Sequence, residues 1–224
     1  MTKNRIVLAA LLIFTLVAPL TSHANLQFKV SLNTTLLVSN PNGPFTMDFQ
    51  LNDGSGTNDA NNTATLTNFS FGGGAASGSP TILGGVSGGV NSTVSLIDSS
   101  FLNLFDQSFN SGGTLSFDLV LTTNVDSGPT PDGFFFSLID GAGNLVPTTG
   151  LLSTFLEVDL DTGSPAIQAF GGVGTYAGIG TPTITAIGGG PSPIPEPGTV
   201  WLLCLGLLGA SFVTRPPGLP IVRG

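Results

Sequence analysis

The alternation of large apolar residues at every second position limits most strongly what this chain can fold into. The alternating residues are Phe45, Met47, Phe49 and Leu51 in one segment and Leu115, Phe117, Leu119 and Leu121 in another. Because successive side chains of a strand point to opposite faces, a period of two places all members of such a set on one face. Each segment therefore predicts a half-buried β-strand.

Further segments rich in Phe, Val, Leu, Ile and Thr extend this pattern along the chain. They predict strands at 26–38, 64–71, 90–97, 133–139, 151–160 and 166–170. Leu102, Leu104 and Phe109 fit either a strand or a short helical turn. The glycine runs at 84–89 and 171–174 are interpreted as loops.

Clusters of Gly, Asn, Asp and Pro separate these segments, as at 52–56, 126–129 and 140–144, and no long helical period interrupts them. Many short strands joined by turns favour an all-β fold. We expect a single β-sandwich body, jelly-roll-like, over residues 25–187. A signal helix should precede it and a hydrophobic helix should follow it.

Residues 1–24 have the three parts of a signal peptide. Lys3 and Arg5 give a positive start, 6–18 are almost wholly apolar, and Ser22-His23-Ala24 offers small residues for cleavage by signal peptidase between Ala24 and Asn25. An uncleaved membrane anchor is the alternative. Thirteen apolar residues would span only about 20 Å, however, against a hydrocarbon core of about 30 Å.

The other end of the chain has an ordered arrangement of its own. A Gly/Pro linker over 188–194 leads to the triplet Pro195, Glu196 and Pro197, and the segment 195–224 contains a predicted hydrophobic helix at 199–213. Arg215 follows this helix and is expected to lie on the cytoplasmic side as a stop. A permanent anchor is the alternative, but the helix would span only about 22 Å.

These residues resemble the PEP-CTERM sorting signal of Gram-negative bacteria, in which such a triplet, a short hydrophobic helix and a basic end are recognised by an exosortase. The resemblance implies transit through the inner membrane, cleavage near Pro195–Pro197, and transfer to the cell surface or an extracellular polysaccharide matrix. The tail at 216–224 departs from the compact basic end of the family. The body resembles an uncharacterised group of PEP-CTERM proteins at 51–56, 69–74 and 115–119, which brings no assigned activity.

The residue inventory argues against an enzyme. The sole His is His23 and the sole Cys is Cys204, so a body processed at both ends would lack the usual general base, the thiol nucleophile and the commonest metal ligands. Between 25 and 195 one Lys stands against eleven Asp and one Glu, a net charge of −11. That charge repels nucleic acid, so no nucleic-acid partner is expected.

One loop offers hard oxygen ligands of the kind that Ca²⁺ prefers. Asp53, Ser55, Thr57 and Asp59 alternate there, with Asn58, Asn61 and Asn62 close by. The spacing is not that of an EF-hand, and the same residue types form ordinary turns. Calcium is thus the one possible cofactor, with turn chemistry as the alternative interpretation.

Glu157, Asp159 and Asp161 also alternate, so a strand would project all three from one face. Two carboxylates there could act as acid and base in glycoside hydrolysis. Acids on an edge strand also prevent unwanted pairing, and this second interpretation is preferred. No catalytic or metal-binding residue is therefore assigned.

Taken together, the sequence predicts an exported, non-enzymatic protein of the cell surface or matrix, associated with exopolysaccharide. The alternatives are a carbohydrate-binding sandwich and, less favoured, a glycan-active enzyme. A carbohydrate binder needs exposed aromatic platforms, which are sparse here because Tyr176 is the only Tyr and Trp201 lies in the predicted sorting helix.

Overall fold

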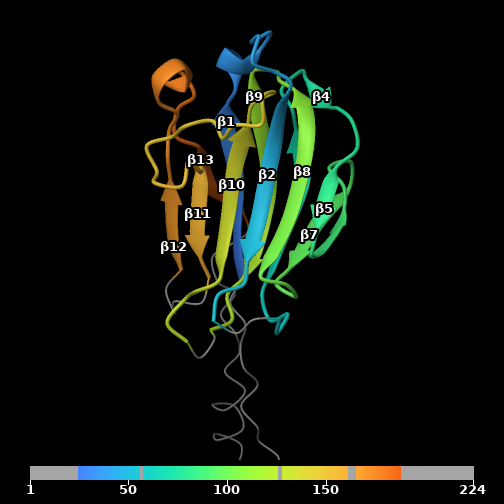
Figure 1. Cartoon of the computed structure of the whole chain (residues 1–224), viewed down its shortest axis with the longest axis vertical. Helices are drawn as coiled ribbons and strands as arrows, with labels where there is room; N and C mark the ends of the chain where they lie inside the picture. Colours follow the sequence, from blue (N-terminus) through green and yellow to red (C-terminus); the bar gives the residue numbers. More distant parts are fainter. Residues whose placement is uncertain (1–24, 56–57, 126–127, 161–164, 188–224) are drawn as a thin grey trace, which may run out of the picture. The chain divides into compact units, whose positions relative to one another are not determined.

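The computed structural model describes residues 25–55, 58–125, 128–160 and 165–187, shown in colour in Figure 1. This part of the chain is all-β, with two short 3₁₀ turns at Thr35–Leu37 and Gly174–Tyr176. Its strands form two antiparallel sheets, consistent with a β-sandwich. The predicted fold class is confirmed, whereas the signal peptide, the linker and the sorting segment lie outside the described residues.

The first sheet has six strands in the order β13-β1-β9-β3-β7-β6. Their bounds are β1 Asn25–Asn33, β3 Thr63–Ser70, β6 Gly85–Gly88, β7 Thr93–Ile97, β9 Thr114–Thr122 and β13 Thr183–Ala186. The nine-residue pairing of β1 with β9 is the longest ladder of this sheet. It joins the start of the described chain to its middle.

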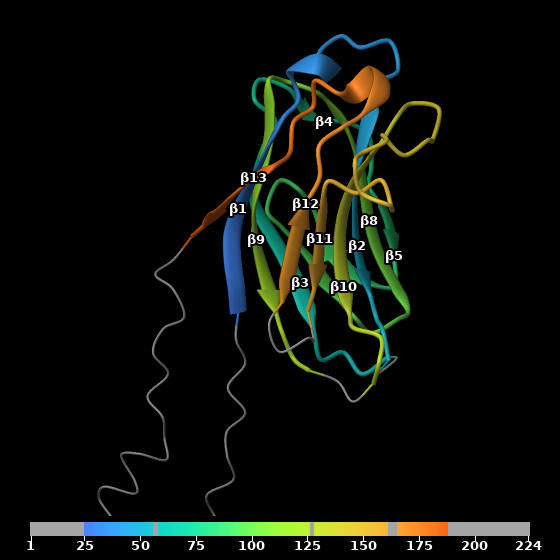
Figure 2. The same cartoon turned by 90° about the vertical axis from the view of Figure 1, so that its left-hand side faces the viewer.

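The second sheet follows the order β12-β11-β10-β2-β8-β4, and β5 also pairs with β8. Its strands are β2 Phe45–Asn52, β4 Ala75–Ala76, β5 Thr81–Leu83, β8 Leu102–Asn110, β10 Gly133–Ile139, β11 Leu156–Asp159 and β12 Ala166–Ala169. This seven-stranded sheet faces the viewer in Figure 1, and Figure 2 shows it from the side. The chain passes repeatedly between the two sheets, so most neighbouring strands are not consecutive in sequence, whereas β6–β7 and β10–β11–β12 are.

An aromatic cluster joins the sheets. The ring centroid of Phe49 on β2 lies 5.1 Å from that of Phe117 on β9 and 5.1 Å from that of Phe136 on β10. All three side chains are fully buried. Edge-to-face and offset contacts of this kind add to the stabilisation from apolar burial. The period-two pattern of the sequence thus produces the sandwich core.

The glycine run at 84–89 was wrongly expected to be a loop, because residues 85–88 form β6 and pair with β7. A Cβ on Gly85 would lie only 2.2 Å from Ser99 Oγ and 2.4 Å from the Ile97 carbonyl oxygen. The backbone N–H of Gly85 donates to Asn103 Oδ1 at 2.7 Å. Only glycine permits this close approach, so the strand lacks the side-chain pattern by which strands are recognised.

Other boundaries also differ from the sequence prediction. Residues 34–38 leave β1 for a 3₁₀ turn, and 151–155 precede β11 as turn and irregular structure. The ambiguous segment around Leu104 belongs to the nine-residue strand β8. In this strand Leu104 faces outward, whereas Phe105 and Phe109 are buried. The short strands β4, β5 and β13 were missed, since two to four residues are too few for a periodic signal.

Within the described ranges, no helix is long and apolar enough to cross a membrane. The two helices expected at the ends of the chain fall on residues outside those ranges.

Candidate functional site

The outward face of the seven-stranded sheet carries a polar surface over its central strands. On β2 the inward residues are apolar, whereas Thr46, Asp48, Gln50 and Asn52 alternate on the opposite face. The register places Asp48 opposite Ser137 of β10 on one side and opposite Asp106 of β8 on the other. A continuous row of polar side chains therefore crosses three strands.

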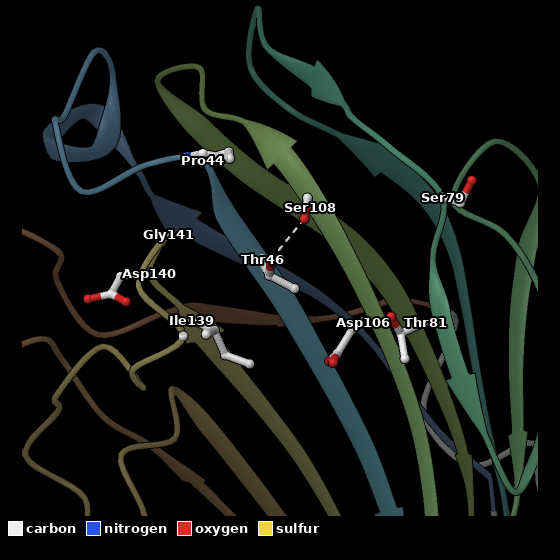
Figure 3. Close-up of a pocket in the computed structure, with 10 residues that line it drawn as sticks. Pro44, Thr46, Ser79, Thr81, Asp106, Ser108, Ile139, Asp140 and Gly141 are labelled. Atoms are coloured by element: carbon white, nitrogen blue, oxygen red, sulfur yellow. Dashed lines mark hydrogen bonds between the residues drawn. The ribbon is translucent and has the colours of Figure 1, made fainter.

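A first hollow of about 320 Å³ opens on this face (Figure 3). It is lined by Pro44, Thr46, Ser79, Thr81, Asp106, Ser108, Ile139, Asp140, Gly141 and Gly143. Thr46 and Ser108 are joined by a hydrogen bond of 3.0 Å between their hydroxyl oxygens. Most of the lining side chains are hydroxyls or carboxylates, which suits a polar ligand.

A second hollow of about 260 Å³ lies further along β2 and β10. Its lining residues are Asp48, Gln50, Asn52, Phe135, Ser137, Leu145, Leu152 and Thr154. The sheet supplies most of the polar groups and one aromatic ring, and the loop between β10 and β11 supplies Thr154 and the two exposed leucines. This loop is held in place where the Thr148 hydroxyl donates to the Thr154 carbonyl oxygen at 2.9 Å.

Two neighbouring carboxyl groups control the charge of this face. Burial, together with the nearby Asp106, raises the pKa of Asp48 to about 6, although Gln50 Nε2 donates to both of its oxygens at 2.9 and 3.1 Å. Burial also raises the pKa of Asp106. One oxygen of Asp106 is shielded from water without a hydrogen-bond donor among the described residues. The face therefore has more acceptors than donors.

Asp140 has a structural role at the rim of the first hollow. Its Oδ1 accepts hydrogen bonds from the N–H groups of Asn144 at 2.8 Å and Ala142 at 3.0 Å. These bonds, chiefly that from the Asn144 backbone, lower the pKa of Asp140. Its carboxylate closes the turn after β10.

The loop predicted to bind calcium takes part in a different polar cluster. The structure brings Asp53 together with Asp98 and Asp132, which are only 1%, 0% and 0% exposed. Asp132 Oδ1 accepts from the Gly54 N–H at 2.7 Å, and its Oδ2 accepts from Asn62 Nδ2 at 2.8 Å. Asp98 Oδ2 accepts from the Asn62 N–H at 2.8 Å. Asn62 is the centre of this buried-carboxylate cluster.

Among the other members of the predicted calcium loop, Asn58 and Asn61 form local turn contacts, whereas Ser55 contacts the distant loop that contains Thr130. Asn58 donates its backbone N–H to Asp53 Oδ2, and Asn61 donates to Asp59 at 3.2 Å from its backbone and 3.0 Å from its side chain. Ser55 Oγ accepts from the Thr130 N–H at 2.8 Å. Thr57 lies outside the described residues.

No group of three or more His, Cys, Asp or Glu side chains in the described part of the chain is arranged to hold a metal ion. Calcium binding at this loop stays a prediction. Burial and the carboxyl group of Asp132 raise the pKa of Asp98 to about 7. Burial likewise raises the pKa of Asp53. The body offers no nearby counter-charge, since its only basic residue, Lys29, pairs with Asp118 at 3.7 Å. A proton therefore offsets part of the buried charge.

The acids at 157 and 159 do not lie on an edge strand, contrary to the sequence interpretation. β11 pairs with β10 on one side and with β12 on the other. Glu157 accepts a hydrogen bond from the Thr154 hydroxyl and lies opposite Phe135. Asp161 lies outside the described residues. Since β12 covers β11, edge protection does not explain these carboxylates.

Sequence reasoning missed Asp98, Asp106 and Asp132 as members of polar clusters. Asp98 follows a predicted strand directly, and Asp132 precedes another directly. An acidic residue immediately next to a predicted strand is therefore a sequence signal from which Asp98 and Asp132 could have been found. Nothing in the local sequence shows that Asp106 faces Asp48, because that pairing depends on register.

The processing residues Ala24, Asn25, Pro195, Glu196, Pro197 and Arg215 were predicted from sequence, and all except Asn25 lie outside the described residues. Asn25 is the first residue of β1, and cleavage before it stays a prediction.

Comparison with known families gives independent support for the sorting signal. Residues 193–215 match the model of the PEP-CTERM protein-sorting motif. No curated protein and no solved structure matches the chain. The motif implies export and processing by an exosortase. The chain thus carries a PEP-CTERM sorting signal, which indicates an exported, envelope-associated protein of Gram-negative bacteria.

Proposed function

We propose that the protein is a non-enzymatic component of the cell surface or extracellular matrix and that it associates with exopolysaccharide. The single observation that carries this proposal is the sorting motif at 193–215, attached to a secreted β-sheet body. An exosortase substrate leaves the cytoplasm, so its working environment is the envelope and the material around it.

The chemistry of the body supports a non-catalytic role. Residues 25–187 contain neither His nor Cys, and the described Glu157 is engaged by the Thr154 hydroxyl. The shallow hollows on the seven-stranded sheet offer hydroxyls and carboxylates as hydrogen-bonding groups. They suit reversible binding of a polar polymer more than they suit a water-excluding reaction centre.

Fractionation of the producing bacterium tests the proposal. We expect the processed protein to occur with the released polysaccharide in the parent strain and to remain in the membrane fraction when the exosortase gene is deleted. Enzymatic degradation of the polysaccharide should release the protein from the matrix of the parent strain. Full-length protein in the cytosol of the parent strain would refute export. A protein that stays in the matrix fraction after the polysaccharide is degraded would refute the association.

A further inference from the structure

We propose that the two hollows on the outward face of the seven-stranded sheet form one trough that binds a neutral, hydroxyl-rich polysaccharide chain. This inference rests on the proposed function and adds the binding site and the chemical class of the polymer. We call the surface the β2/β10 trough and define it by the residues that line the two hollows.

The two hollows follow one another along the adjacent strands β2 and β10. On β2 the first hollow contains Thr46 and the second contains Asp48, Gln50 and Asn52, all on the same face. On β10, Ile139 of the first hollow and Ser137 of the second are likewise neighbours on that face. Six residue steps from Thr46 to Asn52 correspond to about 20 Å of strand. This length fits an extended polymer better than a single small molecule.

The hydrogen-bonding groups of the trough call for a ligand that brings donors. Asp106 and Asn52 each line a hollow, but the Oδ1 atom of each is shielded from solvent and has no donor among the described residues, so it is the Oδ2 atom of Asp106 that would meet a ligand. Sugar hydroxyls are donors as well as acceptors. A hydrogen bond from a hydroxyl to an ionised carboxylate is also stronger than one between neutral groups.

One aromatic ring gives the trough an apolar platform. Phe135 is partly exposed and lies between Gln50 of β2 and Glu157 of β11 in the register. A Cβ on Gly133 would lie 2.7 Å from the Phe135 ring. The glycine therefore makes room for the ring to lie along the strand. An aromatic face beside polar groups matches the apolar faces and hydroxyl rims of pyranose rings.

Charge decides between classes of polysaccharide. The region 25–195 has one basic and twelve acidic residues, and the trough itself includes Asp48, Asp106 and Asp140. An acidic polysaccharide would meet like charge along the trough, whereas a neutral one would meet hydrogen-bonding groups without charge repulsion. The structure therefore favours the neutral class.

Binding should be measured with the protein in the form that the cell produces, purified from the producing bacterium. The probes are neutral and acidic fractions of its deproteinised exopolysaccharide, separated by anion exchange. The test variants are Asp106→Ala and Phe135→Ala. Asp118→Ala is the matched control for loss of one carboxylate, because Asp118 lies on β9 of the other sheet. Phe101→Ala is the matched control for loss of an exposed ring, since Phe101 is 70% exposed in the loop before β8.

We expect the unaltered protein to bind the neutral fraction and each trough variant to bind it about tenfold more weakly or worse, with both controls unchanged. Asp106→Ala should also keep or raise the melting temperature, because it removes an oxygen that lacks a donor. Loss of binding without loss of stability separates a ligand contact from a folding defect.

Three results would overturn the inference. Equal binding by trough variants and controls would refute the site while leaving polysaccharide association intact. Preference for the acidic fraction would refute the neutral class. Binding of the unaltered protein to neither fraction would refute the proposed association itself, and the inference with it.

Discussion

Replacing Asp98 with asparagine should stabilise the protein at neutral pH and reduce the dependence of its stability on pH. Asp98 is 0% exposed, its Oδ2 accepts from the Asn62 N–H at 2.8 Å, and its Oδ1 has no donor among the described residues. Burial and the carboxyl group of Asp132 together raise the pKa of Asp98 to about 7. Asparagine keeps the acceptor for Asn62 and places an N–H₂ group where the acid would hold its proton.

The sign of the pH effect follows from the two pKa values of Asp98, 3.8 in the unfolded chain and about 7 in the folded one. Below pH 4 both states hold the proton. As pH rises from 4 to 7 the unfolded state loses the proton while the folded state keeps it, so the free energy of unfolding falls and then levels off.

The magnitude follows from the size of the shift in pKa. A shift of about 3 units corresponds to about 4 kcal/mol at about 1.4 kcal/mol per unit. We expect about half of this, roughly 2 kcal/mol, because local relaxation and water penetration lower the cost of a buried charge. At pH 7.5 the Asp98→Asn protein should therefore be about 2 kcal/mol more stable than the unaltered protein.

Urea unfolding followed by far-ultraviolet circular dichroism between pH 4 and 8 measures this difference. Asp140→Asn is the control, because it removes one acid in a turn where hydrogen bonds lower the pKa. It should leave the slope between pH 5 and 7 unchanged. An Asp98→Asn protein that is less stable than the unaltered protein at pH 7.5, or that has the same slope, would refute a neutral Asp98 in the folded state.

Three further predictions concern the cluster, the core and the processing site. Asn62→Ala should cost about 3 kcal/mol or more in urea unfolding, because it removes the hydrogen bonds of Asn62 to the buried Asp132 Oδ2 and to the half-buried Asn124 N–H. Faster hydrogen exchange at Asn124 would accompany the loss, and an unchanged midpoint would contradict it. Phe136→Ala should cost about 3–5 kcal/mol, because its ring packs between the sheets against Phe49 and Phe117; a loss below about 1 kcal/mol would show that the core refills the cavity. Glu196→Ala should block processing if the exosortase reads that carboxylate, so intact-mass measurement should find only unprocessed chains, and a normal mature mass would disprove its role.

The core strands were predictable because their alternation is dense and local. Phe45 to Leu51 and Leu115 to Leu121 are buried on one face, as a period of two requires. β6 was not predictable, because glycines carry no pattern and Asn103, eighteen positions away from Gly85, supplies its hydrogen bond. The loop residues around Asp53 were correctly recognised as polar and clustered. Their contacts with Asp98 and Asp132 come from other loops and remained hidden.

Sequence alone determined the sorting signal of this protein and its all-β fold class. The sorting motif is read as a linear segment, and the strand signal depends only on neighbours two residues apart, so both are local properties of the chain. The tertiary structure decided everything that depends on register. It placed Asp48 against Asp106, and Asp132 against Gly54 and Asn62, at separations of up to 78 residues. A shift of one residue in the β2–β8 ladder would turn each side chain of the shifted strand to the other face, and only packing of the apolar face against the opposite sheet fixes that choice. The contacts of Asp132 join loops that come together only once the strands on either side are paired.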